Sequence, residues 1–348
     1  MCKNLKNSNI LDHLESIYSN FYKKKEGIKQ DILQPKIVKY GAANKDKFVY
    51  YIEEECKDAG FFAMYRRWLE YLYFSDICGY TPVINAGSDF LYKEKKAINN
   101  LTNPFEYYFM QPMDIGVREA KHSHNVILSR NIDREMVELV LTGKRNHYKF
   151  NSRYLCMMAH IVRKYIKFNN NTWDYINEGM YRLDFTKERM LGIHIRGTDF
   201  RGMYNNHPVY ITENECFAEV DKLLEKDLYS KIFIATDDSR ILQNFIHKYG
   251  NKICFYNDVV RNNQDISVAF KHSTREWNKY LLGLEVIRDM YALSMCTGLV
   301  AGVSQVAICA QIHKLARKEN YEDKIIINKG VYRNSKCFVV ADEDRKIN

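Results

Sequence analysis

The sequence predicts an α/β fold made of two Rossmann-like halves with parallel sheets that face each other across a cleft. Three observations support this. Short apolar strands alternate with helices throughout 190–328, the pattern of a doubly wound sheet. One strand–helix–strand unit stands out within 47–86. The length, 348 residues, suits two domains of ordinary size. We divide the chain within 170–188, into domains of 1–180 and 181–348.

The composition is that of a globular protein, with 46% hydrophobic and 27% charged residues. Basic residues exceed acidic ones by nine, which suits a polyphosphate ligand or an anionic membrane face. The charges are spread out and no nucleic-acid-binding motif occurs, so we expect no nucleic-acid partner. No signal peptide is recognisable, and no apolar run approaches the ~20 residues that span a membrane.

Nine cysteines are scattered through the chain, without a Cys-x-x-Cys pair. We interpret them as reduced core residues of a cytoplasmic protein rather than as disulfides or zinc ligands. This interpretation rests mainly on the apolar surroundings of four of them: Cys156, Cys254, Cys296 and Cys309.

The first half begins with a polar, helical stretch over 1–45, whose Lys23–Lys25 run we take as a solvated face rather than a membrane contact. Gly60 and Gly79 mark the start and the end of an apolar helix. The aromatic side chains of 103–112 are expected to belong to the hydrophobic core rather than to a site where a sugar stacks on them. Two near-adjacent histidines, His122 and His124, lack a third metal ligand. The other elements expected here are strands over 47–53, 81–86 and 125–128 and a helix over 151–165, after which asparagines weaken the helical pattern.

The second half alternates strand and helix more regularly. Strands are expected over 190–196, 231–238, 252–257, 298–302 and 324–328, and helices over 213–226, 239–249, 277–296 and 304–318.

The first of these strands carries the most informative residues. Leu191, Ile193 and Ile195 share one face, while His194 and Arg196 share the other. Ligands of open α/β sheets lie beyond the carboxyl ends of the strands. The Arg196 guanidinium suits phosphate oxygens, and Gly197 allows a close backbone approach. The turn adds Thr198 and Asp199.

Three further groups stand at or near strand ends. Thr236, Asp237 and Asp238 either cap a helix or bind a ligand. Asp289 shares a helix face with apolar residues, which is costly for a carboxylate unless it has a partner. That partner is either the adjacent N–H donors of a guanine base or a basic residue such as Arg288. The third group opens a helix whose free N–H groups suit an anion; it comprises Val303, Ser304 and Gln305.

Four motifs now carry a resemblance: His194-Ile-Arg-Gly-Thr-Asp199, Ala235-Thr-Asp-Asp238, Val286-Ile-Arg-Asp289 and Gly302-Val-Ser-Gln305. In this order and spacing they resemble the donor domain of the α1,6- and protein O-fucosyltransferase superfamily, over roughly 185–320. The first half matches by architecture alone. The resemblance implies a GT-B-like fold and a metal-independent, inverting transfer from GDP-β-L-fucose, with no further cofactor.

The resemblance also implies roles for single residues. Arg196 contacts the diphosphate, His194 and Asp289 hold the nucleotide, and Asp237 or Asp238 lies near the ribose or base. Ser304 and Gln305 meet the phosphates.

Two departures from the family pattern concern charge. Gly197 replaces a second arginine, for which Arg201 is a substitute, and no carboxylate precedes His207-Pro208, where Tyr204 stands near the expected acid. The acceptor base is therefore Asp199, a first-half carboxylate such as Glu106, or the leaving phosphate.

From these features we expect a cytoplasmic fucosyltransferase that acts on a glycan or a lipid-linked oligosaccharide at the inner membrane face, where it makes a peripheral contact. One alternative is a GT-B enzyme that uses another nucleotide sugar. The other is a non-catalytic protein that binds nucleotides or glycans.

Overall fold

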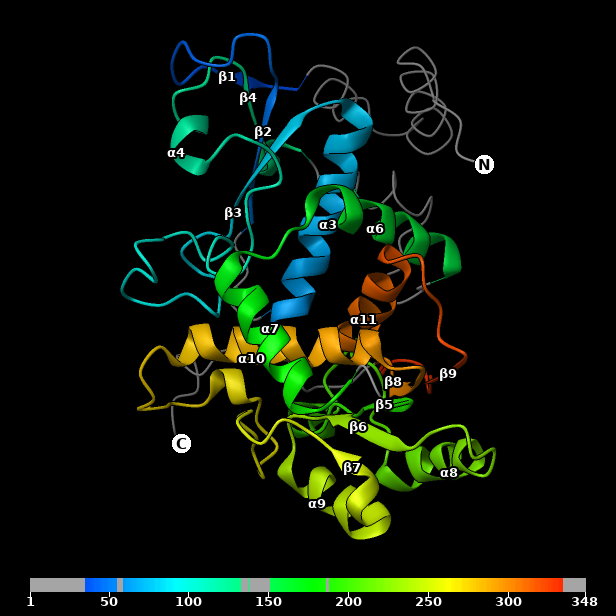
Figure 1. Ribbon diagram of the computed structural model, residues 1–348. Coiled ribbons are helices and arrows are strands. Elements are labelled where there is room, and N and C mark those ends of the chain that lie inside the picture. The colour runs from blue at the N-terminus through cyan, green and yellow to red at the C-terminus, as the bar shows by residue number, and fades with distance from the viewer. Residues whose placement is uncertain (1–34, 55–58, 133–136, 138–150, 186–187, 334–348) are drawn as a thin grey trace.

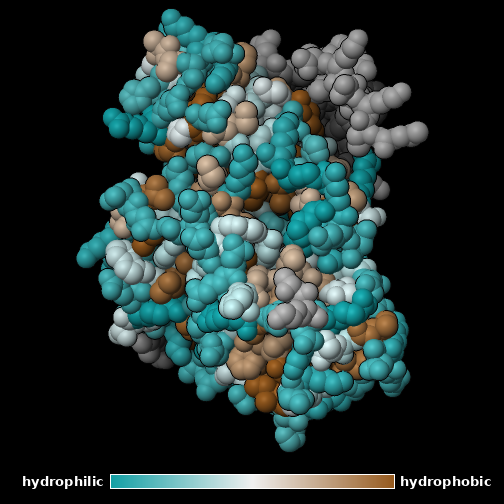
Figure 2. Space-filling view, viewed as in Figure 1, coloured by the Kyte–Doolittle hydropathy of each residue, from teal (hydrophilic) through white to brown (hydrophobic). Residues whose placement is uncertain are grey.

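A computed structural model describes residues 35–54, 59–132, 137, 151–185 and 188–333 (Figure 1). Two sheets stand at opposite ends of this part of the chain, with a layer of helices between them (Figure 1). The visible surface is mostly hydrophilic, with apolar side chains in scattered patches (Figure 2). None of the described helices is long and apolar enough to cross a membrane.

The first sheet has the order β1-β4-β2-β3. Its strands are β1 (Ile37–Val38), β2 (Val49–Glu53), β3 (Thr81–Asn85) and β4 (Val126–Leu128). β2 pairs in parallel with β3 and β4, whereas the two-residue β1 runs antiparallel to β4. The predicted strand–helix–strand unit therefore forms a parallel pair. A short helix, α4 (Val117–Ala120), precedes β4, and a 3-10 turn, η2 (Ser129–Asn131), follows it.

Helix α3 (Phe61–Cys78) connects β2 to β3. It begins after Gly60 and ends at Gly79, whose φ of 68° is left-handed and is therefore suited to glycine. Its buried face includes Trp68, and the aromatic stretch 103–112 packs nearby, with Phe105 against Trp68. That stretch is core, as predicted, because four of its rings are almost fully buried: Phe105, Tyr107, Tyr108 and Phe109.

The second sheet is fully parallel in the order β7-β6-β5-β8-β9. Its strands are β5 (Met190–His194), β6 (Lys231–Ala235), β7 (Ile253–Cys254), β8 (Gly298–Gly302) and β9 (Asp323–Ile327). Its helices are α8 (Glu213–Leu224), α9 (Ser239–Tyr249), α10 (Asn278–Met295) and α11 (Gln305–Ala316), with 3-10 turns η3 (Thr198–Gly202), η4 (Gly250–Lys252) and η5 (Val268–Phe270). The strand order reverses between β5 and β8, the position where such sheets bind ligands.

Helices α6 (Ser152–Tyr165) and α7 (Asn170–Arg182) return from the first sheet and pack on α11 and α10, respectively. The asparagine-rich stretch does not weaken α7 as we expected. Instead, the side chain of Asn169 accepts a hydrogen bond from the Thr172 N–H and so caps the helix. The division into domains of 1–180 and 181–348 remains a prediction.

The six described cysteines are unpaired, and Cys296 and Cys309 are buried as predicted. Cys156 is exposed on α6, so its assignment to the core was wrong: the helix turns this position away from its apolar face. The Lys23–Lys25 run and most of the helix expected over 1–45 lie outside the described residues.

Candidate active site

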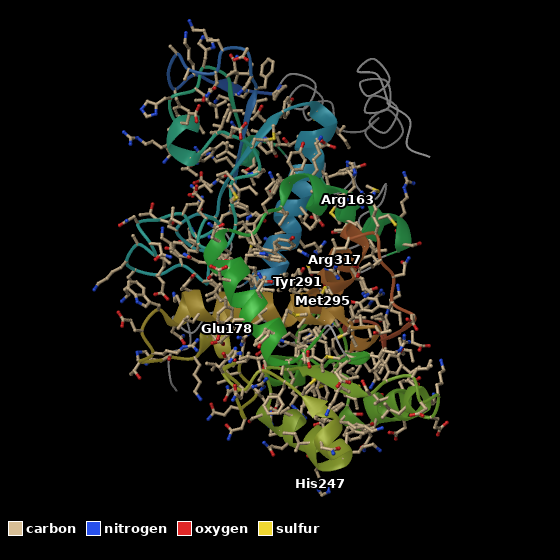
Figure 3. The ribbon with its side chains drawn as sticks, viewed as in Figure 1. Arg163, Glu178, His247, Tyr291, Met295 and Arg317 are labelled. Carbon is tan, nitrogen blue, oxygen red and sulfur yellow. The ribbon has the colours of Figure 1, made fainter. Side chains whose placement is uncertain are left out.

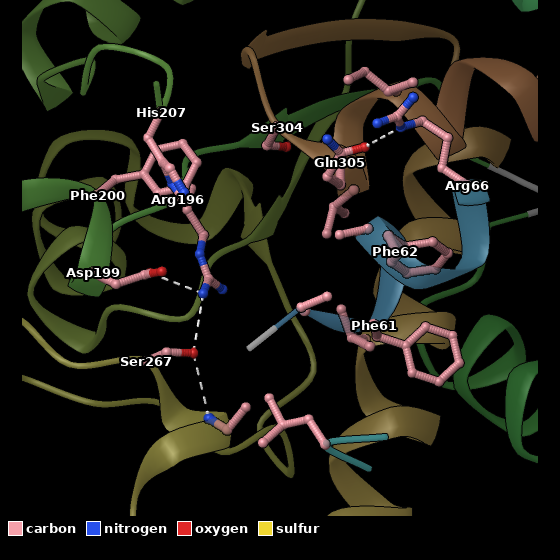
Figure 4. A pocket seen from close by; sticks show the side chains of 18 of the residues that line it. Phe61, Phe62, Arg66, Arg196, Asp199, Phe200, His207, Ser267, Ser304 and Gln305 are labelled. Atoms are coloured by element: carbon pink, nitrogen blue, oxygen red, sulfur yellow. Dashed lines mark hydrogen bonds and ion pairs between the residues drawn. The ribbon is translucent and has the colours of Figure 1, made fainter. Parts of the chain in front are cut away.

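Arg196 lies in the turn after β5, at the carboxyl edge of the second sheet. Its Nη1 pairs with Asp237 Oδ2 at 2.7 Å and its Nη2 with Asp199 Oδ1 at 2.8 Å. Nη2 also donates to Ser267 Oγ at 3.1 Å (Figure 4). Two carboxylates therefore fix the guanidinium, which remains a quarter exposed.

Asp237 holds this turn in place from the end of β6. Its Oδ1 accepts the Gly197 N–H at 2.9 Å, and its Oδ2 accepts the Thr198 hydroxyl at 2.5 Å. Because the same carboxylate also binds Arg196, it fixes both the path of the turn and the direction of the guanidinium. Helix capping was one of the two roles considered for Asp237 and Asp238, and the aspartate that caps α9 is Asp238.

Gly197 has no room for a side chain. A Cβ there would lie 2.3 Å from the Cβ of Asp238 and 2.9 Å from Ile241 Cδ1. We expect Gly197→Ala to cost ~1–3 kcal/mol of unfolding free energy and to lower the Tm by several degrees in a melting experiment. Gly116→Ala is the matched control, because a Cβ there would meet no atom within 4 Å. Equal melting temperatures for the two variants would contradict this account of the turn.

A cavity of about 400 Å³ opens between the two sheets, beside Arg196 (Figure 4). One wall comes from the start of α3 and the loop after β3, with Gly60, Phe61, Phe62, Arg66, Arg67 and Tyr92. The other wall comes from the second sheet, with Arg196, Asp199, Phe200, His207, Ser267, Val303, Ser304 and Gln305.

A second cavity, of about 60 Å³, adjoins the first, and Tyr92, Arg196 and Ser267 line both. The smaller cavity brings together five of the predicted residues: His194, Arg196, Thr236, Asp237 and Asp289. The two cavities lie side by side along the carboxyl ends of the strands, and Arg196 lines both.

His194 is buried at the end of β5. Its Nδ1 donates to the carbonyl of Ala235 at 3.0 Å, and its Nε2 has no partner among the described residues. Burial lowers the pKa of the imidazole to about 4, although Asp237 opposes this shift. The ring is therefore neutral at pH 7, with Nε2 as an acceptor for a ligand donor.

Asp289 is 7% exposed on α10, and its Oδ1 also lacks a partner among the described residues. Burial raises the pKa of this carboxyl to about 7, while Arg261 and Arg288 oppose the shift. The pairing with Arg288 considered from the sequence is not formed, because Arg288 binds both oxygens of Asp258. Asp289 is left with an unmet acceptor that faces the smaller cavity.

Several predicted residues line neither cavity. Asp238 is fully buried, where it caps α9 and binds the guanidinium of Arg240. Arg201 pairs with Asp238 and Glu213 and does not supply the second arginine beside Arg196. Gly197, Tyr204 and Glu106 also lie outside both linings.

Sequence reasoning missed the cavity wall formed by α3. Arg66 and Arg67 occur in an apolar helix of the other half, and no motif marks them. His207 was noticed only as part of a dipeptide; it lines the large cavity, and burial lowers the pKa of its imidazole. Ser267 follows a long loop whose path the sequence does not reveal.

Within the described part of the chain, no group of three or more His, Cys, Asp or Glu side chains could hold a metal ion. His122 and His124 engage the Arg118 carbonyl and the Asn125 side chain, respectively.

A family model described as the N- and catalytic domains of α-(1,6)-fucosyltransferase matches residues 147–322, about half of the chain. The chain belongs to this family. The match includes all four sequence motifs, so the resemblance found in the sequence is confirmed, and this member of the α-(1,6)-fucosyltransferase family is a glycosyltransferase. No curated protein matched the sequence.

Solved fucosyltransferase structures are similar to this chain at low identity. NodZ α-1,6-fucosyltransferase soaked with GDP-fucose has 16% identity and a TM-score of 0.47, covering 76% of this chain and 92% of that one. POFUT1 in complex with GDP-fucose has 8% identity and a TM-score of 0.47, covering 82% and 99%. A mutant of Arabidopsis thaliana FUT1 in complex with GDP has 9% identity and a TM-score of 0.43, covering 88% and 76%.

Proposed function

We propose that this fucosyltransferase moves L-fucose from GDP-β-L-fucose to a hydroxyl of a glycan, with inversion at the anomeric carbon and without a metal ion. In this reaction the acceptor oxygen bonds to C1 of fucose, and the bond from C1 to the β-phosphate oxygen breaks. The electron pair leaves with GDP, and the acceptor proton passes to a base.

One observation carries the choice of nucleotide: His194 Nε2 and Asp289 Oδ1, both buried and both without a described partner, line the same small cavity. Leaving buried acceptors unpaired is costly, so they indicate a ligand that brings donors. A guanine base has adjacent N1–H and N2–H₂ groups that fit one carboxylate. His194 then accepts from a hydroxyl or amine of the same nucleotide.

The diphosphate belongs beside Arg196, at the junction of the two cavities. Helix α11 begins on the same wall of the large cavity as Arg196, and there the Ser304 hydroxyl accepts the Ala307 N–H. The N–H groups of the first helical residues and the helix dipole favour an anion there. Together the guanidinium and the helix start supply the electrostatic stabilisation that a metal ion gives in other transferases.

Asp199 is the base that this geometry supports best. Its Oδ1 is held by Arg196 Nη2, while no bond joins its Oδ2 to another described residue. It also lines the large cavity, where the sugar and the acceptor meet.

We expect Asp199→Asn to lower kcat by about 10²–10⁴-fold, because asparagine cannot take up the acceptor proton. GDP affinity should change much less than kcat, because Asp237 still pairs with Arg196. Initial rates and calorimetry on the same preparation measure the two effects. His207→Gln is the comparison, since His207 is the other proton acceptor in the cavity wall. A larger loss in His207→Gln than in Asp199→Asn would transfer the role of base to His207.

The proposed acceptor is a glycan or a lipid-linked oligosaccharide. If it is lipid-linked, the protein also contacts the inner face of the membrane. The 46% apolar composition and the basic charge are compatible with both acceptors.

The proposed function is tested by calorimetry with GDP, ADP, UDP and CDP, followed by turnover with a panel of nucleotide sugars. Tight binding of GDP alone, and GDP release from GDP-fucose in the presence of an acceptor glycan, are expected. Preference for another nucleotide would contradict the proposal. GDP binding without transfer to any acceptor would instead favour a non-catalytic binding protein.

A further inference from the structure

One hydrogen bond joins the two walls of the large cavity. The Nε of Arg66, on α3, donates to Oε1 of Gln305, the first residue of α11, at 3.0 Å (Figure 4). The two residues lie 239 positions apart in the sequence. Both side chains line the cavity.

Arg66 is itself held firmly. Its Nη1 contacts Glu70 Oε1 at 2.5 Å, and the same nitrogen donates to the Tyr154 hydroxyl at 3.3 Å. The Tyr154 hydroxyl in turn donates to Glu70 Oε1 at 2.9 Å. The Arg66 and Glu70 side chains are only 13% and 3% exposed. A buried, hydrogen-bonded guanidinium of this kind has little freedom to leave Gln305.

The chemistry of arginine decides how the Gln305 amide is oriented. A guanidinium has donors and no acceptor, so only the oxygen end of the amide can face Arg66. The nitrogen end must then point elsewhere, and no hydrogen bond joins Nε2 to another described residue. Gln305 therefore offers two N–H donors at the start of α11, where the helix N–H groups already favour an anion.

We infer that Arg66 is a positioning residue: it holds the Gln305 amide with Nε2 directed at the diphosphate of the donor. The inference rests on the proposed function, since it concerns the same nucleotide site. It also assigns to the first half of the chain a part in binding the leaving group, through a side chain of the second half.

A double-mutant cycle tests this inference, with GDP affinity measured by calorimetry for Arg66→Met, Gln305→Ala and the double variant. If Arg66 acts through Gln305, each single change weakens GDP by about tenfold and the double variant is no weaker than either, because the two residues share one interaction. Guanosine, which has no phosphate, binds all four proteins equally. Independent losses, about 100-fold in the double variant, would overturn the inference.

The controls separate this role from folding. Arg163→Met removes another arginine that bonds α11, through the Ala316 carbonyl at 3.0 Å; this residue lies on α6 (Figure 3) and is not among those that line the cavity. It is expected to leave GDP affinity unchanged.

Gln305→Glu is the alternative test if Arg66→Met does not fold. It keeps an oxygen for the bond to Arg66 but replaces the N–H donors of the amide with a negatively charged oxygen. It is expected to weaken GDP at least as much as Gln305→Ala, with guanosine binding unchanged. Unaltered GDP affinity in Gln305→Glu would overturn the inference. Wild-type protein that binds no GDP would instead overturn the proposed function.

Discussion

Replacing Arg196 with alanine is expected to lower kcat/KM for GDP-fucose by about 10³-fold, the effect of removing a preorganised donor to a developing anion. The guanidinium stands where both cavities meet, and in the proposed reaction it faces the charge that grows on the leaving diphosphate. The change also leaves Asp199 and Asp237 without their shared cation. Initial rates and a melting curve measured together separate lost catalysis from lost folding.

Two further variants sharpen this prediction. Arg196→Lys keeps the charge but not the planar fork that pairs with both carboxylates, so partial activity is expected. Arg240→Ala removes another guanidinium from the same edge of the sheet, one that binds Asp238 and Asp265 and lines neither cavity. If Arg196→Ala and Arg240→Ala had similar rates, Arg196 would have no special part in the transfer.

The second sheet was predictable because its strands are short, apolar and separated by well-formed helices. The polar residues that follow such strands meet at one edge, which is why His194, Arg196, Thr236 and Asp237 were found together. The two-residue strand β1 carries too little pattern to be recognised and depends on pairing with β4. Its antiparallel direction is likewise a tertiary property.

Partners of charged residues were harder to predict. Arg288 and Asp289 are neighbours in sequence, but adjacent residues of a helix point in different directions. Arg288 therefore reaches Asp258 and stacks between Tyr175 and Tyr256, while Asp289 lines the smaller cavity with an Oδ1 that has no partner among the described residues. The role of Arg66 could not be predicted either, because its partner Gln305 belongs to the other half of the chain. Only the folded arrangement of the two halves reveals this contact.

Asp289 should make GDP binding depend on pH. Because its pKa is about 7, the carboxylate, the form that accepts two guanine donors, is lost as the pH falls. Between pH 8 and pH 6 the affinity for GDP is therefore expected to drop about tenfold, as the linkage between proton and ligand requires. Calorimetry at a series of pH values measures this, with Asp289→Asn as the reference that removes the titrating group.

Asp289→Asn is expected to weaken GDP binding but to raise the stability of the folded protein. The folded-state pKa of Asp289 lies above its unfolded value, so the wild-type protein loses stability as the pH rises towards about 7. Asparagine carries no charge, and Asp289→Asn should raise the Tm by a few degrees at pH 8 and by much less at pH 5. At pH 8 it should also weaken GDP strongly, because an amide cannot accept both donors. If Asp289→Asn is more stable but no longer binds GDP, the carboxylate of Asp289 lowers the stability of the folded protein and is needed to bind the nucleotide. Unchanged GDP affinity with an unchanged pH profile would show that the base binds elsewhere.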